Sequence, residues 1–313
     1  MGLSGITNSL SIIAFDPENK QLGGGLLTHT FGACQGIIYI EPGVGVVASQ
    51  AASDPFYAFA GLELMRLGKT PAQILEGIIA LGREAERNQV AMVDVQGSVA
   101  AYTGPTCSPM AGHKTGKYFS CQANLMFKDT VWKKMAEAYE GSTGELVDRL
   151  MGAMEAGENE GGDARGARSA LIKVYTAEPP QKPWSHLVYD FRIYDHPEPL
   201  TELWRLISNQ RAHRAASKAN NLLIGETTNG EQIALAKERL NEALSSIEDI
   251  ECRLEYQWTQ AILLFNIGRT TEAIEIFRQV FAVNPNWREI TAQSATLSPD
   301  EPYARQLDQI LAQ

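Results

Sequence analysis

The sequence predicts an α+β layered sandwich over its first two thirds, followed by a separate all-helical region. Runs of β-type residues come first, then a helix pair, more strands, a second helix pair and final strands. This grouping differs from the strand-helix alternation of parallel α/β sheets, so layered antiparallel sheets are expected. Beyond Leu206 the pattern changes to helix alone. We therefore place the α+β domain at residues 1–208, and a linker and helical domain at residues 209–313.

Composition limits the classes of partner. The 313 residues are 44% hydrophobic and 20% charged, as in a globular protein with a sizeable core. A formal net charge of −10 argues against a nucleic-acid or anionic-membrane partner, because both would repel the chain. The N-terminus lacks a signal-peptide pattern, and no run approaches the roughly 20 apolar residues of a spanning helix. We expect a cytoplasmic protein.

The first fifty residues predict four antiparallel strands, because turn residues separate short apolar runs. The predicted strands are Ser9–Asp16, Leu22–Thr28, Gly36–Ile40 and Val44–Ala48. The glycines at 23–25 would allow another sheet or a substrate to approach the backbone closely.

The next 140 residues predict two helix pairs among further strands. Thr70 suits a helix N-cap and Pro71 the first helical position. The predicted helices are 55–67, 71–81, 130–139 and 144–156, and the predicted strands are 90–94, 99–102, 170–175 and 187–193, with 118–122 as a weaker strand.

The C-terminal region predicts helices over 231–245, 251–267 and 271–283. Small and bulky residues in Trp258–Pro285 are spaced much as in one tetratricopeptide unit. A single repeat is normally too small to be stable, so this unit is expected to dock on the first domain or on a partner. A protein partner, or self-association through the helical domain, is one expected role.

A glycine-rich connection at residues 161–169, called the glycine-rich joint below, links a predicted helix to a predicted strand. Its glycines permit positive φ angles, and Asp163, Arg165, Arg168 and Ser169 gather polar groups at the strand's entrance. The joint is either a functional site or an ordinary connection carrying a surface ion pair.

Several familiar sites are missing from the sequence. The glycine-rich stretches at 23–25 and 112–117 do not match the phosphate-binding loop, and the Gly-x-Ser-x-Gly motif is absent. The four cysteines form no Cys-x-x-Cys pair, and the five histidines lack the His-x-x-x-His spacing. No cofactor or metal is expected, although a metal held by residues distant in sequence stays open.

A series of short motifs resembles one bacterial family, domain of unknown function 1028 (DUF1028), over about residues 9–206. The motifs are Ser9–Ala14, Gln50–Ala51, Val93–Asp94, Tyr102–Gly104, Ala111–Gly116, Cys121–Asn124, Glu155–Gly157, Gly161–Gly166, Ser169–Ala170 and Asp195–Pro199. The family is placed in the N-terminal nucleophile (Ntn) hydrolase superfamily. The resemblance implies a four-layer αββα sandwich, in agreement with the strand and helix order.

The resemblance implies that Ser9 is the nucleophile, at the position where the family has a threonine exposed by removal of Met. In the superfamily the nucleophile's own α-amine is the base, and a free α-amine has a pKa of about 7.7–8. Eight residues precede Ser9 here, so its amine is bound in a peptide bond. The chain is therefore cleaved before Ser9, or is a precursor, or has lost the activity.

Around Ser9 the resemblance places further candidate residues. Asn124 is an oxyanion-hole candidate, Asp163 and Ser169 would orient the amine, and His29 lies near the second strand's end. Arg165 either pairs with Asp163 or binds a substrate carboxylate. Gln50, His113 and Asp94 are weaker candidates, of which the first two are assigned to substrate binding.

The sequence thus predicts a hydrolase of a small amide or peptide-like C–N bond, acting through Ser9 once residues 1–8 are removed. The alternative is a catalytically silent binding or assembly module that recruits a partner through its helical domain.

Overall fold

The computed structural model describes residues 8–81, 85–108, 110–182, 184–223 and 250–313, with residues 235, 238, 240, 241, 244, 245 and 247 between the last two ranges. Contacts divide the chain into two units, Met1–Trp204 and Arg205–Gln313. The change in pattern along the sequence had suggested a boundary four residues later. Most of the predicted helix at 231–245 lies outside the described residues.

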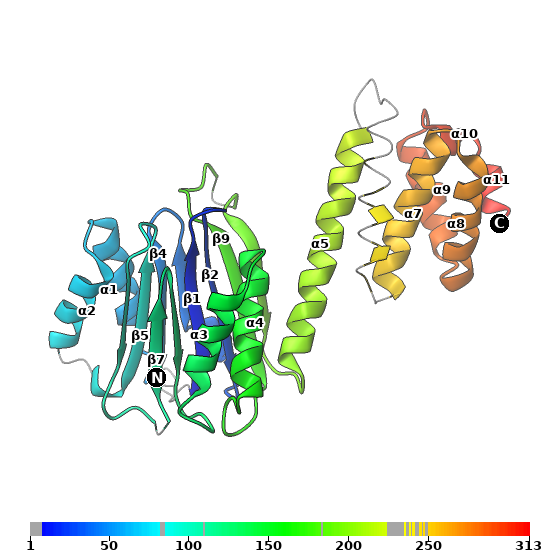
Figure 1. Ribbon diagram of the computed structural model, residues 1–313. Coiled ribbons are helices and arrows are strands. Elements are labelled where there is room, and N and C mark those ends of the chain that lie inside the picture. The colour runs from blue at the N-terminus through cyan, green and yellow to red at the C-terminus, as the bar shows by residue number, and fades with distance from the viewer. Residues whose placement is uncertain are drawn as a thin grey trace, which may run out of the picture. The chain divides into compact units, whose positions relative to one another are not determined.

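A six-stranded antiparallel sheet forms the centre of the first unit (Figure 1), with the strand order β10-β9-β2-β1-β8-β7. Its strands are β1 (Ser9–Asp16), β2 (Gln21–Thr28), β7 (Gly112–Gly116), β8 (Phe119–Ala123), β9 (Ser169–Thr176) and β10 (Leu187–Ile193). The predicted hairpin is confirmed, since Ser9 pairs with Thr28 and Asp16 with Gln21.

A four-stranded antiparallel sheet has the strand order β3-β4-β5-β6. Its strands are β3 (Ile38–Glu41), β4 (Gly45–Ala51), β5 (Asn88–Asp94) and β6 (Val99–Thr103), with short 3-10 turns at η1 (Ala33–Gln35) and η2 (Ala85–Arg87). Val46 pairs with Val93 and Gln50 with Gln89, which sets the register of the two central strands.

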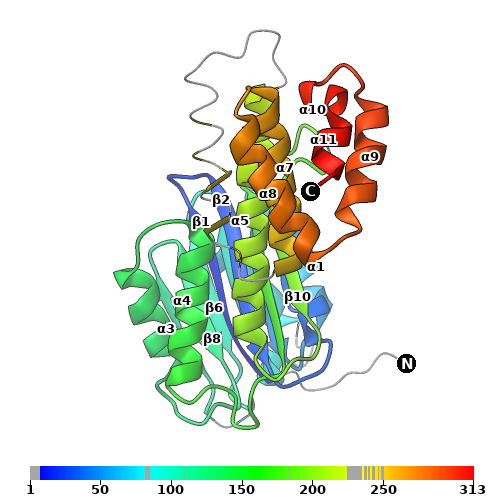
Figure 2. The same cartoon turned by 90° about the vertical axis from the view of Figure 1, so that its right-hand side faces the viewer.

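The two sheets face each other, and helices lie outside them. Figure 1 shows α1 (Pro55–Arg66) and α2 (Pro71–Ala80) on one side, with α3 (Val131–Gly141) and α4 (Leu146–Asn159) on the other. Figure 2 shows α3 and α4 side by side along the strands. The first unit is thus a mixed α+β arrangement of antiparallel sheets and helices.

The glycines of β2 explain how closely these parts pack. A Cβ atom at Gly24 would lie 2.8 Å from Ile38 of the other sheet. At Gly23 it would lie 2.7 Å from Leu150, and at Gly25 2.7 Å from Met154, both on α4. Because neighbouring strand residues face opposite sides, the three glycines admit a sheet on one face and a helix on the other.

Side chains cap the starts of two helices, and the cap at Thr70 with Pro71 is the one that the sequence predicts. The side chain of Asp54 accepts a hydrogen bond from the Phe56 N–H at the start of α1. Thr70 and Gln73 form a reciprocal capping box at the start of α2, with Pro71 as the first helical residue. These helices pack on the outer face of the four-stranded sheet through a buried apolar cluster.

Strand β7 is a feature that the sequence did not predict. The stretch Gly112–Gly116 has little β-type character, but it pairs along β8 across a tight turn. Tyr118 in that turn has φ of +70°, a left-handed conformation that is uncommon for a non-glycine residue. The weak strand at 118–122 is confirmed as β8, shifted by one residue.

The second unit is helical over its described residues, and α5 (Pro199–Leu223) leads into it from the first unit. The later helices are α7 (Ile250–Asn266), α8 (Thr270–Val283), α9 (Trp287–Leu297), α10 (Pro302–Arg305) and α11 (Leu307–Leu311). Phe265 and Phe277 are buried in a cluster of this unit, with Trp258 and Trp287 packed against it. These aromatic residues are therefore covered largely within their own unit. None of the described helices is long and apolar enough to cross a membrane.

Candidate functional site

A row of polar residues crosses the six-stranded sheet at one end. Thr28 pairs with Ser9 on one side and with Ser169 on the other, and the Asn124 N–H donates to the Ser9 carbonyl at 3.1 Å. Directly opposed residues of a sheet face the same side, so the four side chains share the face that meets the second sheet. All four residues are fully buried. Ser9 and Ser169, distant in sequence, thus lie in one row with Asn124.

The second sheet meets this row with two glutamines. Gln50 Nε2 donates to the Ser9 carbonyl at 3.2 Å and to Gln89 Oε1 at 2.7 Å, while Gln50 Oε1 accepts from Ser11 Oγ at 2.6 Å. Gln89 Nε2 in turn donates to the backbone carbonyl of Ala123 at 3.0 Å. Contacts to backbone carbonyls fix which end of each amide is the donor. Buried polar groups of this kind are tolerated because they bond to one another.

This network sets the orientation of Asn124. Its Nδ2 donates to Gln89 Oε1 at 3.1 Å, and its Oδ1 is buried without a hydrogen-bond partner among the described residues. In this state the donor that an oxyanion hole would use is directed to Gln89. The atom left available is an acceptor.

Asn8, the residue before Ser9, is only 7% exposed and lies in the same site. Its backbone carbonyl oxygen accepts hydrogen bonds from Thr28 Oγ1 at 2.6 Å and from Arg165 Nη2 at 3.3 Å. Its side-chain Oδ1 accepts from Ser108 Oγ at 2.8 Å. The carbonyl that is joined to the Ser9 nitrogen is therefore held by a hydroxyl and a guanidinium.

The glycine-rich joint shapes the opposite wall of the site. Gly161, Gly162 and Gly166 all have positive φ, as their lack of side chains permits. Asp163 is 4% exposed, and its carboxylate accepts hydrogen bonds from Arg165 Nε at 2.9 Å and from Arg165 Nη2 at 2.8 Å. The pairing alternative for these two residues is thus the arrangement observed, and it directs the guanidinium toward Asn8.

A second carboxyl group lies beside this ion pair. Burial raises the pKa of Glu158, and the nearby negative charge of Asp163 raises it further. Glu158 Oε2 is buried without a hydrogen-bond partner among the described residues. Its raised pKa follows from this desolvated position.

The two candidate histidines lie at the margin of the site. The His29 N–H donates to Asp163 Oδ2 at 3.1 Å, and its ring Nδ1 lies 2.7 Å from the Gly166 carbonyl oxygen. His113 is exposed on β7, with Nδ1 2.8 Å from Thr103 Oγ1. Within the described part of the chain, no group of three or more His, Cys, Asp or Glu residues could hold a metal ion. Asp94 is occupied in the turn after β5, where its Oδ1 accepts from backbone N–H groups.

Sequence reasoning missed four residues that complete the site, namely Asn8, Thr28, Gln89 and Ser108. Thr28 could have been found from the predicted hairpin. When two strands of equal length are joined by a four-residue turn, the last residue of the second strand lies opposite Ser9, the first residue of the first strand. Gln89 follows from the pairing of β4 with β5 once Gln50 is noted. Ser108 lies in a loop and has no periodic signal.

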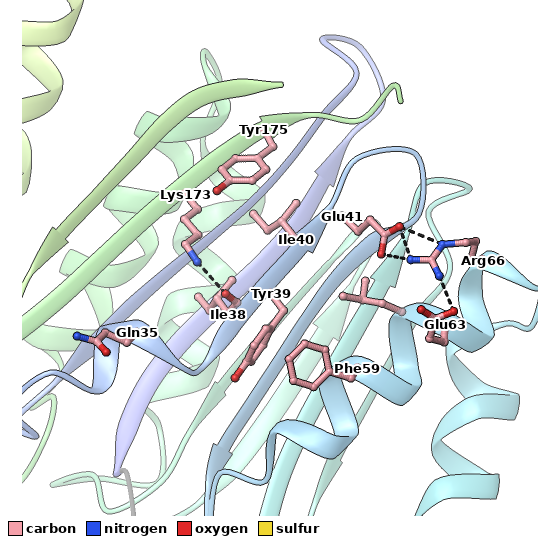
Figure 3. A pocket seen from close by; sticks show the side chains of 11 residues that line it. Gln35, Ile38, Tyr39, Ile40, Glu41, Phe59, Glu63, Arg66, Lys173 and Tyr175 are labelled. Carbon is pink, nitrogen blue, oxygen red and sulfur yellow. Dashed lines mark hydrogen bonds and ion pairs between the residues drawn. The ribbon is translucent and has the colours of Figure 1, made fainter. Parts of the chain in front are cut away.

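A separate cavity of about 390 Å³ opens beside β3, α1 and β9 (Figure 3). Lys173, which is buried, donates from Nζ to the Ile38 carbonyl at 3.0 Å, and Tyr39 meets Phe59 edge-to-face at 5.5 Å. Arg66 forms ion pairs with the two glutamates of the lining. Among the described residues that line the cavity, none belongs to the site predicted from the sequence.

Comparison with known proteins assigns the first unit. Residues 9–203 match a family described as a family of unknown function, DUF1028. The chain belongs to this family. The DUF1028 resemblance inferred from the sequence motifs is thereby confirmed.

Among solved structures, the DUF1028 unit is similar to that of protein SPO2555 from Silicibacter pomeroyi, which is itself described by the DUF1028 family. The two share 27% identity with a TM-score of 0.58, over 64% of this chain and 84% of that chain. Anbu (ancestral beta-subunit) from Yersinia bercovieri gives 9% identity and a TM-score of 0.30, over 62% and 90% of the two chains, too slight a likeness to show the fold. No curated protein matches the chain.

Proposed function

We propose that this DUF1028 protein hydrolyses a small amide or peptide-like C–N bond, with Ser9 as nucleophile once residues 1–8 are released. The free α-amine of Ser9 would be the base, since its pKa of about 7.7–8 is close to neutral pH. In this proposal the two sheets and the two helix pairs are those of the four-layer αββα sandwich of Ntn hydrolases.

The observation that carries this proposal is the environment of the Asn8 carbonyl. Thr28 Oγ1 and Arg165 Nη2 donate to its oxygen. When a hydroxyl attacks a carbonyl carbon, negative charge develops on this oxygen, and preorganised donors stabilise it. The match to DUF1028 begins at Ser9 itself, which supports a functional start at this residue.

We propose further that Ser9 performs the release. Its Oγ would attack the Asn8 carbonyl carbon through a five-membered ring. The C–N bond then breaks, the Ser9 nitrogen gains the proton that left Oγ, and an ester joins Asn8 to Ser9. Water hydrolyses the ester, which gives the Asn8 carboxylate and restores the Ser9 hydroxyl.

The remaining candidates take supporting roles in the proposal. Asp163 holds Arg165 toward the reacting carbonyl, and Ser169, whose Oγ donates to the Ile193 carbonyl at 2.9 Å, braces the row opposite Thr28. Asn124 lines the site beside Ser9 and offers an acceptor to the free amine or to a substrate N–H. His29, Gln50 and His113 hold the surrounding chain, and the helical unit is left to bind a protein partner.

The intact mass of the protein purified from cells tests the proposal. A mass that lacks Met1–Asn8, with the full-length mass retained in a Ser9→Ala variant, is the expected result. Full-length mass in both proteins, together with no amide hydrolysis, would contradict it and favour the silent binding or assembly module.

A further inference from the structure

Asn8 shows how the site receives an acyl group. In the ester described above, the Asn8 acyl carbon is bonded to Ser9 Oγ. Hydrolysis of an external amide would pass through the same ester, with the substrate's acyl carbon in place of that of Asn8. The surroundings of Asn8 therefore describe the acyl pocket of the enzyme.

That pocket makes a specific polar contact to the acyl side chain. Ser108 Oγ donates to Asn8 Oδ1 at 2.8 Å, in a position where Asn8 is 7% exposed. Ser108 itself is half-buried. If an acyl side chain without an acceptor atom filled this place, the hydroxyl would lose this partner. Loss of one hydrogen bond in a half-buried site lowers the free energy of binding, so the contact discriminates between acyl groups.

The loop that carries Ser108 is fixed to the second sheet. The Gly104 N–H donates to the Asn88 carbonyl at 2.9 Å, and Cys107 Sγ contacts the same carbonyl at 3.3 Å. A Cβ atom at Gly104 would lie 2.2 Å from the Glu86 carbonyl oxygen, so this approach requires glycine. The hydroxyl is thus held in place rather than carried on a free loop end.

Charge favours a carboxamide over a carboxylate in this pocket. Among the described residues, Arg165 is the cation with a contact to Asn8, at its backbone carbonyl, and its charge is already paired by the two oxygens of Asp163. An aspartyl side chain at the place of Asn8 would lose hydration without gaining a cation of its own, and such burial is unfavourable.

From these contacts we infer that the acyl part of the substrate is asparaginyl: a residue whose side-chain carboxamide oxygen accepts the hydrogen bond of Ser108. The inference rests on the proposed hydrolase function, because it names the substrate class of the same site.

The test compares 4-nitroanilides of acetyl-asparagine, acetyl-aspartate and acetyl-leucine, on folded protein trimmed so that Ser9 is the first residue. Leucine is nearly isosteric with asparagine but has no acceptor. We expect kcat/KM to favour asparagine about tenfold over leucine, as loss of one side-chain hydrogen bond implies. Ser108→Ala should bring the two within about threefold, whereas Ser98→Ala, a hydroxyl deletion outside the site, should leave the ratio unchanged.

Binding of acetyl-asparagine, measured by calorimetry, separates the two claims. If the anilides turn over equally, if aspartate is preferred, or if the asparagine preference survives Ser108→Ala, the acyl-pocket inference is wrong and the hydrolase function stands. If none is hydrolysed but acetyl-asparagine binds and Ser108→Ala weakens that binding, the pocket stands and the hydrolase function fails. Absence of both hydrolysis and binding overturns both.

Discussion

The layer between the two sheets has an apolar half and a polar half. Along β1 the side chains that face the second sheet change from Ser9 and Ser11 to Ile13. Opposite them the paired residues of β4 and β5 change in the same direction, as Gln50–Gln89, Ala48–Ala91 and Val46–Val93. The valine and alanine pairs belong to the apolar core together with Ile13, whereas Gln50 bonds to Ser9 and Ser11, and Gln89 bonds to Gln50.

The difference separates what stabilises this unit from what the unit does. Apolar side chains alone would fill the layer without the free-energy cost of burying polar groups, because each buried polar group destabilises the fold unless it is hydrogen-bonded. Polar residues nonetheless occupy the end where Ser9 begins its strand, and they hold the carbonyls on both sides of its nitrogen. We interpret the apolar half as the source of stability and the polar half as the proposed reaction site.

The largest effect is expected in the polar half. In protein trimmed to Ser9, Asp163→Ala should lower the amide hydrolysis rate about 10²–10³-fold, the usual scale for loss of preorganised donors and their supports. Asn124→Ala should also lower the rate, because it removes the buried Oδ1 acceptor that is offered to the Ser9 amine or to a substrate N–H. Asp190→Ala is the matched control, because Asp190 also binds an arginine two residues away, Arg192, but outside the site. Rates are compared with thermal melting curves. If Asp163→Ala and Asn124→Ala melt far below the parent while their folded fraction reacts normally, these residues are structural.

The apolar half should show the opposite behaviour. Ile13 is fully buried in the inter-sheet core, so Ile13→Ala should lower the free energy of unfolding by about 2–5 kcal/mol through lost burial and a cavity. Urea denaturation measures this change, and the folded fraction should keep its hydrolysis rate. A loss of rate without a loss of stability would break the division between the two halves.

A smaller loss of stability is expected inside the polar network. Ser11→Ala removes the donor to Gln50 Oε1 and the acceptor of Gln122 Nε2, so it should cost about 1–3 kcal/mol. Ser142→Ala, whose hydroxyl donates to the Tyr139 carbonyl at the end of α3, is the control and should cost less. Equal losses in urea denaturation would mean that the buried network has no special role in stability.

The smallest effect is a pH dependence at Glu158. Burial and the charge of Asp163 raise the pKa of Glu158 in the folded state, so the folded chain binds this proton more tightly than the unfolded chain. Stability from this group is therefore full below the unfolded pKa of about 4.3 and is lost as pH rises through the folded pKa. Glu158→Gln should raise Tm at pH 7 relative to the parent and leave it nearly unchanged at pH 4. Glu76→Gln, which removes an exposed carboxylate on α2, should change Tm little at either pH.

The sequence predicted more of the fold than of the site for a physical reason. The short β-type run at Ser9–Asp16 and the capping pair at Thr70 and Pro71 are local signals, and both correspond to observed elements. Strand β7 was not predicted, because its pairing with β8, rather than its own composition, makes it a strand. The roles of Asn8 and Ser108 also depend on contacts across the fold, here between residues 100 positions apart. Contacts between residues so far apart produce no local spacing pattern from which the site could be predicted.

The central claim is that reactivity belongs to Ser9 with a free amine, and one measurement tests it most directly. Hydrolysis of a small amide is compared for the full-length chain, whose intact mass shows that residues 1–8 are retained, and for folded protein trimmed to Ser9. The account predicts activity in the trimmed protein, little in the full-length chain, and none in trimmed protein that carries Ser9→Ala. Equal activity with and without residues 1–8, or activity that survives Ser9→Ala, would contradict it.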